Sequence, residues 1–297
     1  MKFRLLLPAF FLYAVSHSQS SITDHFKIYD TKTKQLVNID KIIADCVDAD
    51  VVFFGEEHND SAGHYLEAEI FKGLHKVYGD HLALSLEMFE TDNQLALDEY
   101  LAGKIPEDRF SKDVRLWSNY KDYRPMIEYA KQNRLNVIAA NPPRRYVSMV
   151  SRRGMKSLDS LSKDAKKFLP PLPYDTLTGR YRDKFVEVMK GAPGSSSPNI
   201  YYSQSLWDAG MSWSIYSYRK QNKSKKIFHC VGNFHCDEKL GTLAQLQHRK
   251  SKLKILNISC FSDSSFSNPD PMAIGWEKFS NRGDYLIMTD PDLKKTF

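Results

Sequence analysis

The chain has 297 residues, of which 42% are hydrophobic, 12% aromatic and 26% charged. This composition is typical of a globular protein and excludes a disordered, collagen-like or coiled-coil chain. The net charge of +6 is spread along the sequence and argues against a nucleic-acid partner, and four cysteines are too few for a disulfide scaffold.

The first eighteen residues have the features of a secretory signal peptide. Lys2 and Arg4 give a short basic start, and residues 5–15 form an apolar stretch. This stretch is too short to cross a bilayer of about 30 Å as a helix. Small residues follow at 16–18, so we expect cleavage after Ser18.

Nothing in the rest of the sequence predicts a membrane anchor. No later stretch approaches eighteen consecutive apolar residues, and the first cysteine is Cys46, so no lipid-accepting cysteine follows the signal peptide. We therefore expect residues 19–297 to be exported to the periplasm or the extracellular space, without a transmembrane segment and without an evident lipoprotein anchor.

The exported chain alternates apolar runs of strand length with helical patterns. Strand-like runs lie at residues 51–54, 82–86, 136–140, 226–231, 253–260 and 285–288, and helical spacing at 61–78, 93–101 and 125–133. The last helix is expected to begin at Pro125, a favoured residue at a first helical position. Short buried strands separated by helices predict an α/β fold, with a mostly parallel sheet covered by helices on both faces.

Residues 143–222 contain no strand-like run. Prolines at 170, 171 and 173 and a loop rich in Gly, Ser and Pro at 191–198 break this stretch into helices. We expect a helical cap packed over one end of the sheet. Residues 19–297 are therefore predicted to form a single domain with this excursion at about 143–222.

Polar side chains follow four of the predicted strands. Glu56 and His58 follow the first, Glu87 ends the second, residues 141–145 follow the third, and His235 follows the fourth. Because the carboxyl ends of parallel strands share one edge, where ligands bind in open α/β sheets, we expect these side chains to converge.

The two histidines stand in similar segments, Gly-Glu-Glu-His at 55–58 and Gly-Asn-Phe-His at 232–235. Each glycine is expected to allow a tight exit from its strand. Two histidines and one or two glutamates at one edge would make a metal site or an acid/base pair. The ordinary alternative is that each histidine is a loop residue and each glutamate caps a helix.

Several segments in order along the chain carry a resemblance. They are Gly55–Glu56–Glu57–His58 with His64, Leu86–Glu87–Met88–Phe89, Asn141–Pro142–Pro143–Arg144, Gln204–Ser205–Leu206–Trp207–Asp208 with Met211, and Gly232–Asn233–Phe234–His235. Together they resemble the ChaN-like haem-binding uptake family of the Tiki superfamily, over about residues 45–258. The resemblance implies an α/β fold and an exported bacterial protein that binds haem or iron.

In that family a tyrosine ligates the haem iron, and haem can sit cofacially between two subunits, so the resemblance also implies a homodimer. No Cys-x-x-Cys-His segment occurs, so haem b would be held non-covalently. The candidate haem-binding residues are Tyr120, Tyr123, Arg124, Tyr201, Tyr202 and Asp208. Tyrosinate is a good ligand for ferric haem, and a nearby arginine would pair with a propionate.

Asp208 lies on a predicted helix at 200–220. Gln204, Asp208 and Met211 fall on one face of this helix, with Trp207 beside them. Asp208 would then orient a ligand histidine; the alternative is an acid on a solvated stripe.

The resemblance also supports a second hypothesis, a hydrolase. Tiki proteins are metal-dependent proteases that use two Gly-x-x-His segments and a glutamate, and the distantly similar erythromycin esterases use histidine and glutamate at the same edge. The matching catalytic positions here are Glu56, His58, Glu87 and His235, and a divalent metal ion would be held by His58, His64, Glu87 and His235. No Gly-x-Ser-x-Gly, phosphate-loop, Gly-x-Gly-x-x-Gly or His-Glu-x-x-His motif offers another chemistry.

The four cysteines leave two states open. In an exported protein one or two disulfides can form. Cys46, Cys230 and Cys260 fall in predicted helices or strands, where cysteine is commonly a small core residue with a free thiol. Cys236 follows His235 directly and could ligate a soft metal.

Overall fold

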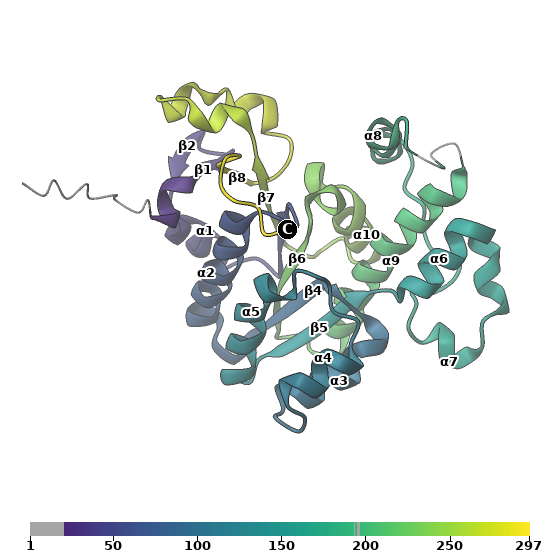
Figure 1. Cartoon of the computed structure of the whole chain (residues 1–297). Coiled ribbons are helices and arrows are strands. Elements are labelled where there is room, and N and C mark those ends of the chain that lie inside the picture. Colours follow the sequence, from purple (N-terminus) through teal and green to yellow (C-terminus); the bar gives the residue numbers. More distant parts are fainter. Residues whose placement is uncertain (1–20, 193, 195–196) are drawn as a thin grey trace, which may run out of the picture.

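The computed structural model describes residues 21–192, 194 and 197–297. Eight strands form one sheet in the order β2-β1-β8-β7-β3-β6-β4-β5 (Figure 1). They are β1 (Phe26–Asp30), β2 (Gln35–Val37), β3 (Val51–Glu56), β4 (Leu82–Glu90), β5 (Asn136–Asn141), β6 (Lys226–Gly232), β7 (Ile255–Ser262) and β8 (Tyr285–Thr289). The signal peptide predicted at residues 1–18 lies outside the described residues.

The sheet is mostly parallel, as predicted. The six strands β8, β7, β3, β6, β4 and β5 run parallel to one another, whereas β1 is antiparallel to both β8 and β2. Strands β1 and β2 were not predicted from the sequence. Lys27 interrupts the apolar run of β1, and β2 has only three residues, of which two are exposed.

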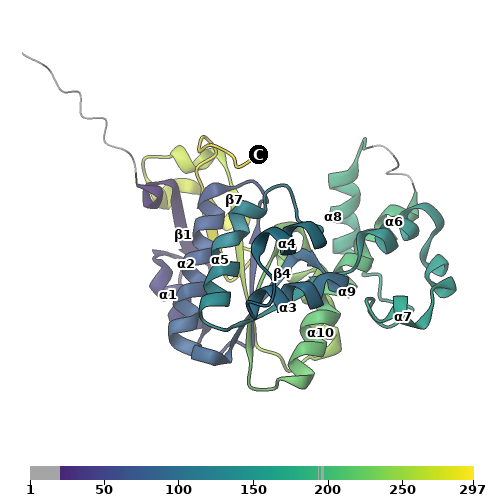
Figure 2. The same cartoon turned by 60° about the horizontal axis from the view of Figure 1, so that its bottom comes forward.

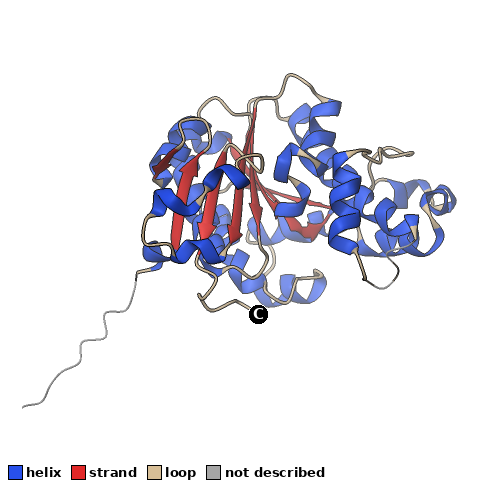
Figure 3. Ribbon diagram, turned by 90° about the horizontal axis from the view of Figure 1, so that it is seen from above, coloured by secondary structure: helices blue, strands red, loops and turns tan. Residues whose placement is uncertain are grey.

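Helices cover both faces of the sheet (Figure 3). The ten α-helices of the described residues are α1 (Ile39–Cys46), α2 (Ser61–Tyr78), α3 (Gln94–Leu101), α4 (Glu107–Asp113), α5 (Tyr120–Gln132), α6 (Arg144–Arg153), α7 (Lys163–Lys166), α8 (Arg180–Met189), α9 (Pro198–Gln221) and α10 (Gly241–Arg249). Strand β3 shows why two layers are needed. Val52 and Phe54 join the core with α1, α2 and α5, while Val51 and Phe53 join the core with α9 and α10. The strand is therefore apolar throughout instead of alternating.

The predicted helical excursion is present. Among the described residues, 143–222 contain helices and no strand. Helices α6, α7 and α8 gather around the N-terminal half of α9, to one side of the sheet (Figure 2). No helix of the described chain is long and apolar enough to cross a membrane.

One predicted helix start is wrong. Helix α5 begins at Tyr120, and Pro125 lies inside it instead of at its first position. Because Pro125 follows directly after the first turn, its missing N–H removes only one hydrogen bond near the helix end.

All four cysteines are buried free thiols, so neither of the disulfides that the sequence allowed is formed. Cys230 on β6 and Cys260 on β7 cannot meet, because β3 lies between those two strands. Two strand spacings of about 4.8 Å place their Cα atoms beyond the roughly 7 Å that a disulfide can span.

Candidate functional site

A pocket of about 600 Å³ lies at the carboxyl edge of the parallel strands. It is lined by His58, Glu87, Glu90, Arg115, Leu116, Trp117, Ser118, Asn119, Asn141, Pro142, Arg144, Trp207, His235 and Phe297. The residues from β3, β4, β5 and β6 meet there, as expected for an open α/β sheet. The helical excursion reaches the same pocket through Arg144 and Trp207.

His58 follows β3 and is held on three sides. Its Nδ1 lies 2.6 Å from Oε1 of Glu56, the last residue of the strand. Its backbone carbonyl accepts a hydrogen bond of 2.8 Å from the Asn119 side chain, and its ring packs edge-on against Trp117 with centroids 5.0 Å apart. The Nε2 atom is therefore the nitrogen that His58 can offer to a ligand.

His235 lies in a short 3-10 helix, Asn233–His235, directly after β6. Its Nδ1 is 2.7 Å from Oδ1 of Asp208 on α9, so the contact predicted between Asp208 and a strand-edge histidine is present. Asp208 is fully buried and also accepts hydrogen bonds from Thr242 Oγ1 at 2.9 Å and Tyr181 O–H at 2.5 Å. This support orients the ring so that Nε2 faces the pocket.

Glu87 lies near both imidazoles. Its Oε1 is 3.8 Å from His235 Nε2, and its Oε2 accepts a hydrogen bond of 2.8 Å from the Gly232 N–H. A Cβ at Gly232 would lie 2.9 Å from His58 Nε2 and 3.6 Å from Glu87 Oε2. The predicted convergence of His58, Glu87 and His235 is therefore present in the structure.

The two glycines of the Gly-x-x-His segments are needed for close packing. Neither Gly55 nor Gly232 has a positive φ, and Gly232 has φ −53. A Cβ at Gly55 would come within 2.5 Å of Cys236 Sγ. The tight exit from each strand therefore needs no positive φ, and what both positions require is space.

Nearby carboxylates raise the pKa of both pocket imidazoles above the ordinary histidine value. Burial lowers the pKa of His58, but the hydrogen bond to Glu56 and the charge of Glu87 outweigh it and raise this pKa to about 9. Burial also opposes the proton on His235, and the charges of Asp208 and Glu87 nevertheless raise its pKa. A ligand that needs a neutral imidazole must therefore displace a proton.

His64, in the first turn of α2, lies behind this pocket and does not line it. Its Nδ1 is 3.2 Å from Oε2 of Glu56 and 3.2 Å from Oε2 of Glu67, and all three side chains are buried. The structure thus separates His64 from the other three predicted metal ligands, and it adds Glu67, which the sequence analysis did not name.

Comparison with known proteins identifies the family of this chain. The profile of a family described as haem-binding uptake, Tiki superfamily, ChaN matches residues 42–246. The chain belongs to this family. A structure of cofacial haem binding to ChaN of Campylobacter jejuni superposes with a TM-score of 0.66 at 17% identity, over 90% of this chain and 97% of that one, and so shares the fold.

Two further similarities are weaker. The Arabidopsis thaliana protein RETICULATA-RELATED 5, chloroplastic, is 26% identical over 140 residues, which are 45% of this chain but only 19% of that protein. An erythromycin esterase mutant in its open conformation covers 80% of this chain and 77% of its own, at 12% identity and a TM-score of 0.47.

The four tyrosines predicted as haem ligands lie outside the pocket of this ChaN-family chain. Tyr120 packs among aromatic rings, and Tyr123 is fully buried and donates to Glu56 Oε1 at 2.7 Å. Burial raises the pKa of both phenols, with the charge of Glu56 adding to it at Tyr123, and this disfavours the tyrosinate. Tyr201 donates to the Leu177 carbonyl, and Tyr202 is partly buried between two cores.

Arg124 is exposed and forms a bidentate ion pair with Glu107, so it does not reach the pocket. The cations that do line the pocket are Arg115 and Arg144. Arg144 belongs to the polar cluster predicted after the third strand, whereas no motif marks Arg115. The supporting residues Tyr181 and Thr242 were likewise missed, because each contacts Asp208 from a distant part of the sequence.

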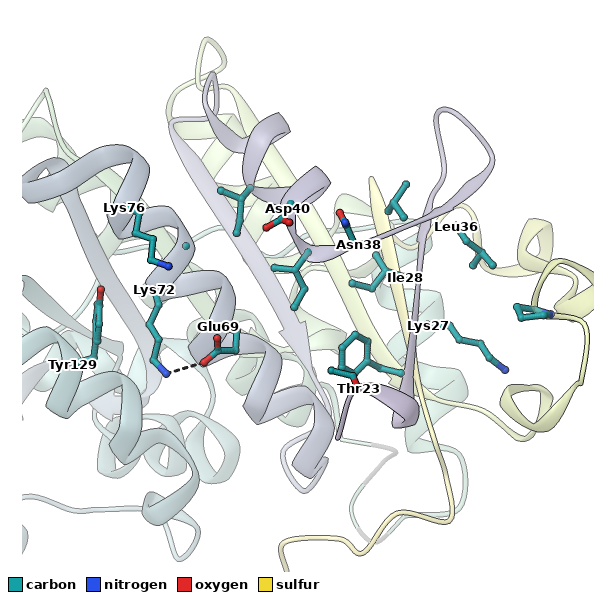
Figure 4. Close-up of a pocket in the computed structure, with 16 residues that line it drawn as sticks. Thr23, Lys27, Ile28, Leu36, Asn38, Asp40, Glu69, Lys72, Lys76 and Tyr129 are labelled. Atoms are coloured by element: carbon teal, nitrogen blue, oxygen red, sulfur yellow. Dashed lines mark hydrogen bonds and ion pairs between the residues drawn. The ribbon is translucent and has the colours of Figure 1, made fainter. Parts of the chain in front are cut away.

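A second cavity, of about 690 Å³, lies over β1, β2, α1 and α2, away from the strand-edge residues (Figure 4). Apolar side chains and the cations Lys27, Lys72 and Lys76 line it. Tyr129 stands at its edge, with its hydroxyl 2.9 Å from Nδ1 of His75. This tyrosine was not among the predicted ligands, and it provides a matched control for the haem experiments below.

Proposed function

We propose that this ChaN-family chain is an exported protein of haem uptake that binds haem b, without a covalent bond, in the strand-edge pocket. One observation carries the proposal. Two imidazoles, each held at Nδ1 by a buried carboxylate, present Nε2 to the same pocket. Imidazole nitrogen is a common axial ligand of haem iron, and carboxylate partners of this kind orient ligand histidines.

The rest of the pocket lining suits the other parts of a haem. Trp117 and Trp207 offer aromatic surface beside the two histidines, and apolar and aromatic side chains line most ligand pockets. Arg115 and Arg144 supply the positive charge that haem propionates require. Bound haem would supply the iron chemistry, while the chain positions the porphyrin and limits the access of water.

A hemin titration tests this site. Purified mature chain should develop a Soret band on titration with hemin, and His58→Ala and His235→Ala should each weaken binding by about tenfold or more. Tyr129→Phe is the control in the second cavity and should bind as the wild type does. A series in which Tyr129→Phe abolishes the band and both histidine variants retain it would overturn the strand-edge location.

Export and assembly belong to the same proposal. The basic start and apolar stretch of residues 1–18 support secretion, and mass spectrometry of protein from its native host should find a mature chain that begins near Gln19. Cofacial haem binding in the Campylobacter jejuni relative supports a homodimer here. Analytical ultracentrifugation with and without hemin should detect the dimer. A mature protein that still carries Met1 would contradict export, and a strictly monomeric haem complex would contradict the homodimer.

A second candidate function is hydrolysis of a peptide or ester bond. It is favoured by the carboxylate of Glu87, which lies 3.8 Å from His235 Nε2 and is close to His58 Nε2. These three groups, with Glu56 behind His58, form either an acid/base set or the ligands of a catalytic divalent ion. Metal analysis of hemin-free protein, together with ester and peptide hydrolysis in the presence of chelator, tests this function. Protein without a divalent ion and without hydrolytic activity would exclude it.

A further inference from the structure

Behind the strand-edge pocket, three buried side chains place potential metal ligands close together. Glu56 ends β3, and His64 and Glu67 belong to the first two turns of α2. One ligand atom from each residue lies within 4.8 Å of the others. None of the three side chains lines the strand-edge pocket, so this cluster is a separate feature of the molecule.

The cluster is short of hydrogen-bond donors. Glu56 Oε2 and Glu67 Oε1 are buried without a hydrogen-bond partner in the described part of the chain, and so is Asp122 Oδ2, 3.9 Å from His64 Nε2. Among the described residues, the ion pairs of Glu56 and Glu67 involve only the imidazoles of His58 and His64. Buried carboxylates normally have full hydrogen bonding or a cation, so these oxygen atoms point to a missing partner.

His64 is oriented so that Nδ1 is the nitrogen available to such a partner. Its Nε2 lies 3.2 Å from the backbone carbonyl of His58 and donates to it. This hydrogen bond keeps a proton on Nε2, so Nδ1, which faces Glu56 and Glu67, is the nitrogen that an ion can bind once it displaces the proton there. A carbonyl that holds the opposite ring nitrogen is a common support for a metal-binding histidine.

We propose that Glu56, His64 and Glu67 form a buried site for a divalent transition-metal ion. One imidazole and two carboxylates suit ions such as Zn²⁺, Mn²⁺ or Fe²⁺, whereas Mg²⁺ and Ca²⁺ prefer ligand sets made of oxygen alone. The ion would replace a proton on His64 Nδ1 and contact the unpartnered carboxylate oxygens. It would thereby give these oxygens the partner that they lack in the described part of the chain.

This site would be coupled to the pocket through Glu56. One oxygen of Glu56 accepts from Tyr123 at 2.7 Å and holds His58 Nδ1 at 2.6 Å, while the other faces His64. An ion on the second oxygen would hold the Glu56 carboxylate, and through it His58, in one position. The inference concerns a site separate from haem binding and holds whether or not haem enters the pocket.

Metal analysis of the mature full chain tests the proposal. Metal-stripped protein is dialysed against Zn²⁺ or Mn²⁺, and the bound ion is measured by mass spectrometry. Wild type should bind one equivalent that Glu67→Gln loses, with affinity reduced by about tenfold or more. The control Glu69→Gln changes a partly exposed glutamate of the same helix, paired with Lys72, and should bind as wild type does. The variant His235→Asn should also keep this equivalent, because it alters only the strand-edge pocket.

Two outcomes would overturn the site: wild type that binds neither ion, or Glu67→Gln that keeps the same equivalent. If Glu67→Gln does not fold, X-ray absorption of wild type loaded with one equivalent of Zn²⁺ decides the question. A single imidazole among oxygen ligands supports the buried site. Two imidazoles would place the ion between His58 and His235 and overturn it.

Discussion

In the first Gly-x-x-His segment, the carboxylate that holds the histidine lies two residues away, at Glu56. In the second, it lies 27 residues away, at Asp208 on α9. Both carboxylates are fully buried and both hold Nδ1 of their histidine. The two halves of the pocket thus reach the same geometry, one through a local contact and the other through tertiary structure.

The two carboxylates differ in how completely they are satisfied. Asp208 accepts from His235, Thr242 and Tyr181, so both of its oxygens have donors. Glu56 leaves Oε2 without a hydrogen bond and faces a second buried carboxylate, Glu67. We therefore expect the second half of the pocket to contribute more to the stability of the fold, and the proposed cation to bind beside the first half.

The largest expected effect follows from this difference. Asp208→Asn should lower the free energy of unfolding by about 3 kcal/mol, because it breaks a buried charged pair and leaves donors without acceptors. Glu56→Gln should cost less than about 1.5 kcal/mol, because the amide oxygen can still accept from Tyr123 and one of two buried like charges disappears. Urea unfolding of metal-free protein measures both values. A larger loss for Glu56→Gln than for Asp208→Asn would contradict the comparison.

Substitutions at Gly55 and Gly232 should have different effects, the first on packing and the second on ligand binding. Gly55→Ala should destabilise the chain by about 1–3 kcal/mol, because its Cβ would lie 2.5 Å from Cys236 Sγ and 3.0 Å from Asn233 Cα. At Gly232 the nearest atoms belong to the His58 ring, whose side chain is 37% exposed and has room to move. Gly232→Ala should therefore leave stability within about 1 kcal/mol and weaken hemin binding by about tenfold. Unchanged hemin affinity in Gly232→Ala would place His58 outside the haem site.

Cysteine replacement tests whether the thiol beside His235 takes part in binding. Cys236 is buried against Gly55, is absent from the lining of the pocket, and has a thiol whose pKa burial raises well above its usual value. Cys236→Ala should cost about 1 kcal/mol of stability and should not change hemin or metal binding. Cys46→Ala, in α1, is the matched control. A loss of metal binding only in Cys236→Ala would restore the soft-metal ligand that the sequence suggested.

The smallest expected effect concerns Arg124, which was predicted to contact haem but lies outside both halves of the pocket. Arg124→Gln should leave hemin binding unchanged and cost less than about 1 kcal/mol, since its pair with Glu107 is largely exposed. The hydrogen bond from Arg124 lowers the pKa of Glu107, so this small stabilisation is present above the ordinary glutamate pKa of about 4.5 and is lost as the pH falls below it. Unfolding at pH 7 and pH 3 measures the difference between variant and wild type, which should be smaller at pH 3. Weaker hemin binding in Arg124→Gln would contradict this assignment.

Part of the site could be predicted because its residues are adjacent to strand ends. His58, Glu87 and His235 each follow or end an apolar run, and parallel strands in one sheet bring such ends together. Asp208 was predicted from its position on a helix face beside Trp207. The tyrosine ligands could not be chosen in the same way, because a tyrosine in an amphipathic segment has the same pattern whether its hydroxyl is buried, as at Tyr123, or lies at a cavity edge, as at Tyr129.

The sequence by itself determined the parallel sheet, the helical excursion and the edge at which polar side chains meet, because hydrophobic periodicity and strand ends are local properties of the chain. Only the tertiary structure decided that Asp208 reaches His235, that His64 turns away toward Glu67, and that Cys230 and Cys260 stay apart on either side of β3. Each of these outcomes depends on strand order and helix packing, which bring together residues far apart in the chain. No local pattern encodes such distances.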